Sequence, residues 1–143
     1  MKKALFALFG LICSVAGGAQ TDSTTFRGHL YNDEYKVALH INFYDQDITV
    51  PGQEVFGQMA GYLSKEGTTY CWLIVGADMK SDKRARLVMS NDYGSEDLEA
   101  ELTRQNDSTY VLKHTKGSVL KVPNKGKWQK LPTILQFKTK KVR

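Results

Sequence analysis

Within residues 35–44 of this chain, residues of two classes alternate strictly over the nine positions 35–43. The apolar or aromatic positions are Tyr35, Val37, Leu39, Ile41 and Phe43, and the positions between them are Lys36, Ala38, His40 and Asn42. Successive side chains of a β-strand point to opposite faces, so a period of two predicts a strand with one buried and one wet face. This segment is the clearest strand in the sequence.

Other segments have a strand-like composition or alternation, and turn residues separate them. They are residues 26–31, 55–63, 68–75, 85–89, 98–102, 110–113, 118–122 and 133–139. The segment 55–63 is apolar on both faces and contains Gly57 and Gly61, which in a strand indicate a bend, a bulge or a close backbone contact. Residues 76–83 are predicted to form a loop.

Short strands joined by tight turns predict an all-β fold, arranged as an antiparallel meander of about eight or nine strands. Residues 92–102 would also fit a short acidic helix, but the alternation of Leu98, Ala100 and Leu102 favours a strand. Closing the meander into a small barrel would protect its edge strands, so a barrel is the predicted architecture. A two-sheet β-sandwich is the alternative.

Residues 1–19 have the layout of a secretory signal peptide. Lys2 and Lys3 form a positive start, residues 4–16 are almost all apolar, and Gly17-Gly18-Ala19 provides the small residues of a cleavage site. We therefore expect export, cleavage after Ala19, and a single all-β domain over residues 20–143 that is periplasmic or extracellular. No second apolar run approaches the roughly 20 residues that a membrane helix needs, so no membrane span is expected after cleavage.

The charge and the cysteine content narrow the function classes. The chain has 20 basic and 15 acidic residues, a net charge of +5, and loss of Lys2 and Lys3 would leave +3. Such mild and dispersed basicity argues against a nucleic-acid partner. Cleavage would leave Cys71 as the one cysteine, which excludes an intramolecular disulfide. Its apolar, strand-like neighbours in residues 70–75 favour a buried thiol over one paired with another chain, and we expect a monomer.

No sequence motif for catalysis or for a cofactor is found. The chain lacks a Gly-X-Ser-X-Gly motif, a phosphate-binding loop, a dinucleotide fingerprint and a zinc motif, so no catalytic residue, cofactor or metal ligand is predicted. His29 and His40 would lie on the outer faces of neighbouring strands, with Asp33 and Glu34 in the turn between them. A weak divalent-metal site there is the alternative to two ordinary solvent-facing histidines, the interpretation that we adopt.

Acidic side chains gather on one predicted strand. Glu99 and Glu101 share a face at i and i+2, and paired carboxylates serve glycoside hydrolysis in some enzymes. On an exposed strand such a pair is more often a solubilising face. If residues 84–102 form a hairpin, Arg84 and Arg86 would lie opposite these carboxylates and pair with them.

Three short features recur in one family of barrels. The first predicted strand opens with Phe26-Arg27-Gly28, the third contains Gly57 and Gly61, and Gly126-Lys127-Trp128 lies near the end. Together they resemble small exported calycin-type proteins, the lipocalin-like and avidin-like barrels, over most of residues 20–143. True lipocalins carry Gly-X-Trp on the first strand, whereas here it lies in the last quarter of the chain. The resemblance implies a barrel that carries a ligand, although a fold does not establish a function.

The resemblance implies carriage of a small apolar molecule inside the barrel by a non-enzymatic binding protein. Phe43, Phe56, Tyr70 and Trp72 are the residues expected to line the cavity. The alternative is a protein-binding inhibitor or immunity-type factor that acts through an exposed loop. Residues 46–52 and 76–83 are the candidate loops, because loops on rigid scaffolds often carry recognition. A packed interior would favour the loop hypothesis, and an open apolar cavity would favour the carrier.

Overall fold

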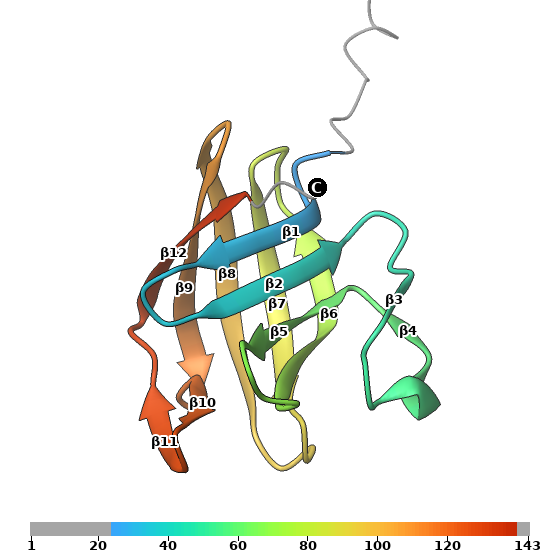
Figure 1. Ribbon diagram of the computed structural model, residues 1–143. Coiled ribbons are helices and arrows are strands. Elements are labelled where there is room, and N and C mark those ends of the chain that lie inside the picture. The colour runs from blue at the N-terminus through green and yellow to red at the C-terminus, as the bar shows by residue number, and fades with distance from the viewer. Residues whose placement is uncertain (1–23, 140–143) are drawn as a thin grey trace, which may run out of the picture.

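Eight antiparallel strands close into a barrel in the computed structural model, which describes residues 24–139 (Figure 1). The order around the barrel is β1-β12-β9-β8-β7-β6-β5-β2. Each strand is hydrogen-bonded to the next one in this order, and β2 is hydrogen-bonded to β1. The strands are β1 (Arg27–Asn32), β2 (Val37–Asn42), β5 (Gly61–Lys65), β6 (Cys71–Met79), β7 (Arg84–Asn91), β8 (Asp97–Asn106), β9 (Thr109–Gly117) and β12 (Ile134–Thr139). The predicted all-β meander barrel is confirmed, and the sandwich is not observed.

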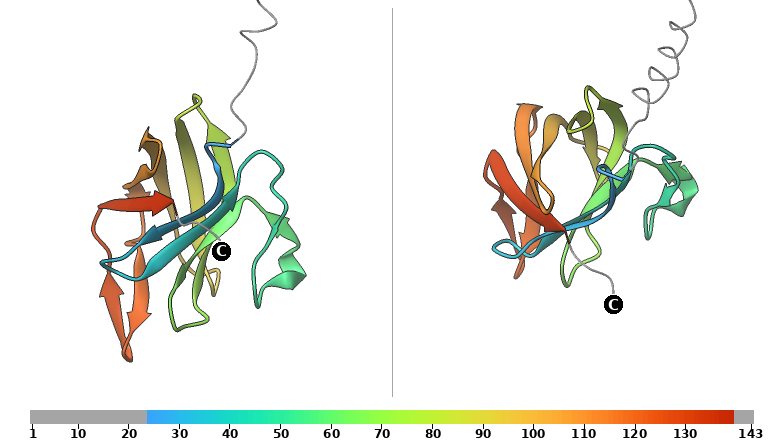
Figure 2. Two further views of the ribbon diagram at one scale, coloured as in Figure 1. Left: turned by 45° about the horizontal axis from the view of Figure 1, so that its top comes forward. Right: turned by 90° about the horizontal axis from the view of Figure 1, so that it is seen from above.

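Two excursions leave the barrel wall. The first lies between β2 and β5 and contains β3 (Ile48–Thr49), the short 3-10 helix η1 (Glu54–Phe56) and β4 (Gln58–Met59). The second lies between β9 and β12 and is the hairpin of β10 (Lys121–Asn124) and β11 (Lys127–Lys130). Viewed along the barrel, the first excursion stands outside the ring of strands (Figure 2). None of the helical residues in the described part of the chain forms a span that could cross a membrane.

The inward positions of every barrel strand form one core. Its largest fully buried members are Trp72, Phe26, Phe43, Phe137, Leu39, Leu63, Ile74, Leu87, Met89, Leu102, Leu135 and Val37. The alternation that predicts β2 recurs in other strands of the wall. In β7, for example, Ala85, Leu87 and Met89 are buried, and Arg84, Arg86 and Val88 are exposed. The Trp72 indole Nε1–H donates a 2.8 Å hydrogen bond to the Lys121 carbonyl, which ties the β10–β11 hairpin to the core.

A second, smaller core lies on the outer side of the wall. Val50, from the first excursion, packs against Cys71 and Leu73 of β6, with Met59 and Tyr62 at its edge. Strand β6 is consequently buried on both faces over Cys71–Ile74, as its apolar sequence suggests. The predicted burial of the Cys71 thiol is confirmed, because Cys71 is free and only 4% exposed.

Most of the predicted segments have other bounds in the structure, as three examples show. Residues 76–79, predicted as loop, continue β6 after a bulge between Ile74 and Gly76. Residues 55–63, predicted as one strand, contain the end of η1, then β4 and the start of β5, because Gly57 at φ 76° breaks the extended backbone. Residues 97–106 form a strand, as the alternation of Leu98, Ala100 and Leu102 predicts.

Candidate functional site

The residues predicted to line a ligand cavity do not all reach the interior. Phe43, Tyr70 and Trp72 belong to one buried core, with 1%, 5% and 0% of their surfaces exposed. Phe56 lies on η1 in the first excursion and is 60% exposed, so its predicted interior position is wrong. The chain leaves the wall after β2, and Val50 rather than Phe56 anchors this excursion.

Aromatic side chains fill part of the barrel core. Phe26 stacks on Phe43 at 5.3 Å between ring centroids, and Trp72 and Phe137 are fully buried members of the same core. An eight-stranded barrel is just wide enough to be filled by its own side chains or to hold one small ligand. The burial of these large rings favours the filled interior. A site for a partner is therefore best sought on the rims and the outer face.

The turns before β6 and after β7 and the β10–β11 hairpin, at the end of the barrel that points down in Figure 1, together line a cleft. We call it the rim cleft; its volume is about 370 Å³, and three segments distant in sequence build it. Its lining residues are Thr68, Thr69 and Tyr70 before β6, Asp92 and Tyr93 after β7, and Pro123, Gly126, Lys127 and Trp128 of the β10–β11 hairpin.

Three aromatic rings meet in the rim cleft. The buried Tyr70 ring lies 5.1 Å from the ring of Trp128 in an edge-on arrangement and 5.8 Å from the ring of Tyr93. Trp128 is 51% exposed and Tyr93 is 74% exposed. Burial raises the pKa of Tyr70 to about 12, so its hydroxyl stays neutral at physiological pH. The rim cleft thus presents the exposed rings of Tyr93 and Trp128, and both rings lie against the buried ring of Tyr70.

The loop that carries Tyr93 is held in shape by a buried amide. The Asn91 Oδ1 atom accepts hydrogen bonds from the backbone N–H groups of Ser95 and Glu96, at 2.9 and 3.1 Å. Asn91 is 4% exposed, so these bonds are shielded from water. This network fixes the two ends of the turn and so limits the positions that Tyr93 can take.

The hairpin beside the rim cleft is positively charged. It carries Lys121, Lys125, Lys127 and Lys130 and no acidic residue between positions 118 and 131. Lys121 Nζ lies 5.4 Å from the centre of the Trp128 ring and 3.4 Å from a Glu96 carboxylate oxygen. Within residues 24–139, the other three lysines have no carboxylate within ion-pair distance. The cleft therefore combines aromatic faces with one lining lysine, Lys127, and one lining carboxylate, Asp92, beside a hairpin that carries three further lysines.

Of the four residues predicted from the sequence to bind a ligand, Tyr70 lines the rim cleft, whereas its exposed rings, Tyr93 and Trp128, are not among them. Tyr93 and Trp128 are aromatic, and on a sheet such residues are normally assigned to the core. The local signal is the polar surrounding of each ring: Trp128 lies between Lys127 and Gln129, and Tyr93 lies in an Asn-Asp-Tyr-Gly turn. Both surroundings are typical of exposed turns and hairpins.

A second groove, of about 430 Å³, borders the rim cleft and has Cys71 at its base. It runs between the first excursion and β5, and the two clefts share Thr68, Thr69 and Asp92. The Gln53 side chain donates a hydrogen bond to the Asp92 carboxylate and so links the excursion to the turn after β7. Burial, and then the charge of Asp92, raise the pKa of the Cys71 thiol to about 11. A thiol of this kind is a poor nucleophile.

Alkylation should test the protonation state of Cys71. At pH 8 we expect iodoacetamide to modify Cys71 at least about 100-fold more slowly in the folded protein than in urea, because the thiolate is the reactive form and is rarer by that factor. Mass spectrometry of the peptide that contains Cys71 measures the rate. The rate in the folded protein should rise as the pH approaches 11. Equal rates with and without urea would contradict the burial of the thiol.

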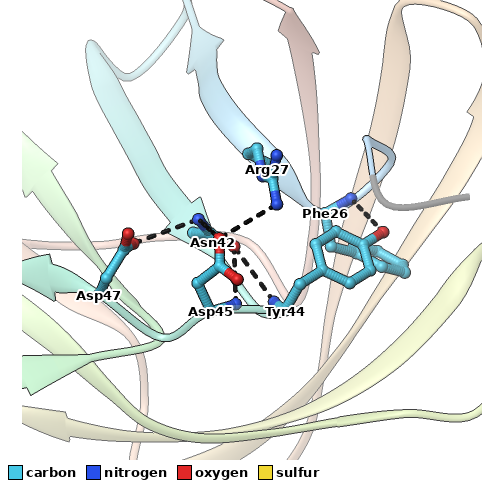
Figure 3. A network of polar contacts seen from close by, with 6 residues as sticks. All are labelled: Phe26, Arg27, Asn42, Tyr44, Asp45 and Asp47. Atoms are coloured by element: carbon cyan, nitrogen blue, oxygen red, sulfur yellow. Dashed lines mark hydrogen bonds and ion pairs between the residues drawn. The ribbon is translucent and has the colours of Figure 1, made fainter.

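Hydrogen bonds of Asn42 and an ion pair of Arg27 hold the start of the candidate loop at residues 46–52 (Figure 3). Asn42, 7% exposed, accepts hydrogen bonds at Oδ1 from the backbone N–H groups of Tyr44 and Asp45, at 3.2 and 3.0 Å. Its Nδ2 group donates to Asp45 Oδ2 and Asp47 Oδ1, at 3.1 and 3.2 Å. Arg27 adds a 3.1 Å ion pair to Asp45. This network sets the direction in which the first excursion leaves β2.

Replacement of Asn42 should destabilise the fold through this network. We expect Asn42→Ala to lower the free energy of unfolding by about 1–3 kcal/mol, because the four partly buried hydrogen bonds of this buried amide are lost. Asn106→Ala is the matched control: Asn106 Oδ1 also accepts from a backbone N–H group, that of Ser108, but the residue is exposed. Its loss should cost less than about 1 kcal/mol. Urea unfolding measures both, and equal losses would show that burial of the network is unimportant.

The predicted cross-strand pairing of charged residues is confirmed in one case. Arg84 on β7 forms a 3.1 Å ion pair with Glu101 on β8. Arg86 is the register partner of Glu101, so β7 and β8 form the expected hairpin. In the second candidate loop, residues 76–83, the part up to Met79 belongs to β6, and residues 80–83 form the turn to β7. Lys80 at the start of this turn forms a 2.6 Å ion pair with Asp78 of β6.

The histidines come together as the sequence suggests, but the acidic residues of the turn do not join them. His29 and His40 are register partners, whereas Asp33 lies beyond the end of β1 and pairs with Lys36 at 3.1 Å. Among residues 24–139, no group of three or more His, Cys, Asp or Glu side chains converges in a way that could hold a metal ion. Comparison with protein families, with curated proteins and with solved structures gave no significant match.

Proposed function

We propose that this protein is an exported, non-enzymatic binding protein that recognises a partner protein through the rim cleft. The single observation that carries the proposal is the meeting of exposed Tyr93 and Trp128 beside a lysine-rich hairpin, in which Lys121 alone is paired with a carboxylate among residues 24–139. Aromatic anchors surrounded by polar residues are typical of protein interfaces. The leader that would direct export, residues 1–19, lies outside the described residues.

The charge of the cleft defines the segment of the partner that it fits. Lys125, Lys127 and Lys130 favour an acidic segment, and the faces of Trp128 and Tyr93 favour an apolar or aromatic side chain within it. Of the nearby acidic residues, Glu96 is paired with Lys121, whereas Asp92 accepts a hydrogen bond from the neutral Gln53 amide, which does not neutralise its charge. We therefore propose an acidic segment with a central apolar side chain as the ligand.

Carriage of an apolar molecule inside the barrel stays a prediction that rests on the resemblance to calycin-type proteins. It would require displacement of rings that are now fully buried, such as Trp72 and Phe43. Recognition at the rim requires no such change, because Tyr93 and Trp128 are already exposed. The packing therefore favours the rim cleft as the binding site.

Site-specific photocrosslinking in the organism that makes the protein tests this proposal. A photoreactive phenylalanine analogue at position 93 should give one discrete protein adduct, crosslinked within an acidic segment of the partner. The matched control is the same analogue at Val55, which is 87% exposed but lies on η1. The adduct from position 93 should disappear in a Trp128→Ala background.

Three outcomes would overturn the proposal. One is the absence of any adduct from position 93, and another is the same adduct pattern from positions 93 and 55. The third is an adduct that persists unchanged when Lys125 and Lys127 are both replaced by Glu. A small molecule that copurifies with the protein and is released on unfolding, found by native mass spectrometry, would support the carrier instead.

A further inference from the structure

Two histidines face each other on the outer surface of the wall formed by β1 and β2, the pair of strands at the front of Figure 1. His29 is the direct register partner of His40, and their Nδ1 atoms lie 2.5 Å apart. The ring centroids are 4.6 Å apart, with the ring planes inclined by 74°. Two nitrogens this close hold at most one proton between them, because one Nδ1 must accept with its lone pair the hydrogen that the other donates.

One of the two rings is held in place by a neighbouring strand. His40 stacks on Tyr62 of β5 with 4.6 Å between ring centroids and 24° between planes. Tyr62 is the register partner of His40 and packs against the outer core of Val50, Cys71 and Leu73. His29, by contrast, is exposed at the edge of this aromatic row. The pair therefore consists of one fixed imidazole and one that can adjust to a ligand.

We propose that His29 and His40 together bind a divalent transition-metal ion through their Nδ1 atoms. Neutral imidazole suits Cu²⁺, Ni²⁺ and Zn²⁺, and a proton moved to Nε2 leaves an Nδ1 lone pair on each ring. Metal–nitrogen bonds of about 2.0–2.1 Å separate two adjacent ligand nitrogens by about 3 Å. A small rotation of the exposed His29 ring supplies the extra separation.

The two imidazoles supply only part of a coordination shell. No third His, Cys, Asp or Glu side chain joins them among residues 24–139, so water completes the shell and the ion stays accessible. Affinity follows the usual order for divalent ions, with Cu²⁺ bound most tightly of the three. This site lies on the outside of the wall, and its existence does not depend on the rim cleft or on the function proposed for it.

Metal titration of protein purified without a histidine tag tests the proposal. Calorimetry with CuCl₂ and with ZnCl₂ should give one ion bound per chain, and the electron paramagnetic resonance spectrum of bound Cu²⁺ should show coupling to two imidazole nitrogens. His29→Ala and His40→Ala should each weaken binding by about 100-fold, because a second ligand on the same scaffold acts at high effective concentration. His114→Ala is the matched control, since His114 lies on β9 and should bind no metal with the pair.

The outcomes separate the proposal from nonspecific binding. Circular dichroism without metal should show that both variants keep the fold, because His29 and His40 lie on the outer face of the wall. Unchanged affinity in the His29→Ala/His40→Ala double variant would overturn the proposal. So would an equal loss in His114→Ala, or a copper spectrum of the wild type without imidazole nitrogen coupling.

Discussion

Replacement of Trp72 by alanine should lower the free energy of unfolding by about 3–5 kcal/mol, the loss expected when a buried tryptophan is removed from a core. Trp72 is fully buried, and its indole N–H is the donor to the Lys121 carbonyl. The variant would lose packing in the barrel and also the bond that holds the β10–β11 hairpin against it. A small domain has only about 5–15 kcal/mol of stability in total, so the effect should be obvious in urea unfolding.

Trp128→Ala is the matched control for this experiment. Trp128 is the same residue type but is half exposed, so its loss should cost less than about 1 kcal/mol. If Trp72→Ala fails to fold, Trp72→Phe separates the two contributions. It retains most of the ring and removes the N–H donor, which should cost about 1–3 kcal/mol. Similar losses for Trp72→Ala and Trp128→Ala would contradict the filled barrel.

Gly61→Ala should destabilise the protein by at least about 3 kcal/mol, because an added Cβ would meet backbone rather than a movable side chain. The Cβ would lie 2.3 Å from the His40 carbonyl oxygen and 3.0 Å from the Ile41 Cα atom. Ile41 and Gly61 are register partners, so relief of the clash requires β2 and β5 to separate. Urea unfolding and far-ultraviolet circular dichroism measure the loss.

Gly76→Ala provides a control within the same barrel. Gly76 lies inside β6, and an added Cβ would be 3.8 Å from its nearest neighbour, the Cβ of Val88, which is an ordinary contact. The change in stability should lie within about 1 kcal/mol of zero, since alanine also restricts the unfolded chain. If both variants had the same stability, the close approach of β2 and β5 at Gly61 would be wrong.

The barrel could be predicted because most of its strands have one buried face and one solvent-exposed face. In β8, for example, Leu98, Ala100 and Leu102 are buried while Glu99 and Glu101 face outward, and this alternation is written directly in the sequence. Burial of Cys71 could be predicted for a related reason, since β6 is apolar on consecutive positions and is covered on both sides.

The first excursion could not be predicted from the same signals. Val55 and Phe56 are apolar, and periodicity places such residues in a strand, yet they are 87% and 60% exposed on η1. Hydrophobicity reports a tendency to be buried, and the actual burial depends on a neighbouring surface. Here that surface, on β6, is taken by Val50.

The rim cleft was also beyond the reach of sequence patterns. Its walls come from the turn before β6, the turn after β7 and the β10–β11 hairpin, which lie far apart along the chain. Periodicity describes one element at a time and contains no information on which turns share an end of the barrel. The three segments become neighbours only once the order of the strands is known.

The seam of the barrel has a consequence for the order of folding. Leu30 of β1 pairs with Thr139 of β12, so the last gap in the wall is closed by segments from opposite ends of the described chain. The hairpins β1–β2, β6–β7, β7–β8 and β8–β9 need only local chain, whereas this pairing has the largest loop-closure entropy in the barrel. Closure is therefore expected to be the last step, and a nascent chain keeps two open edges until its final strand has emerged.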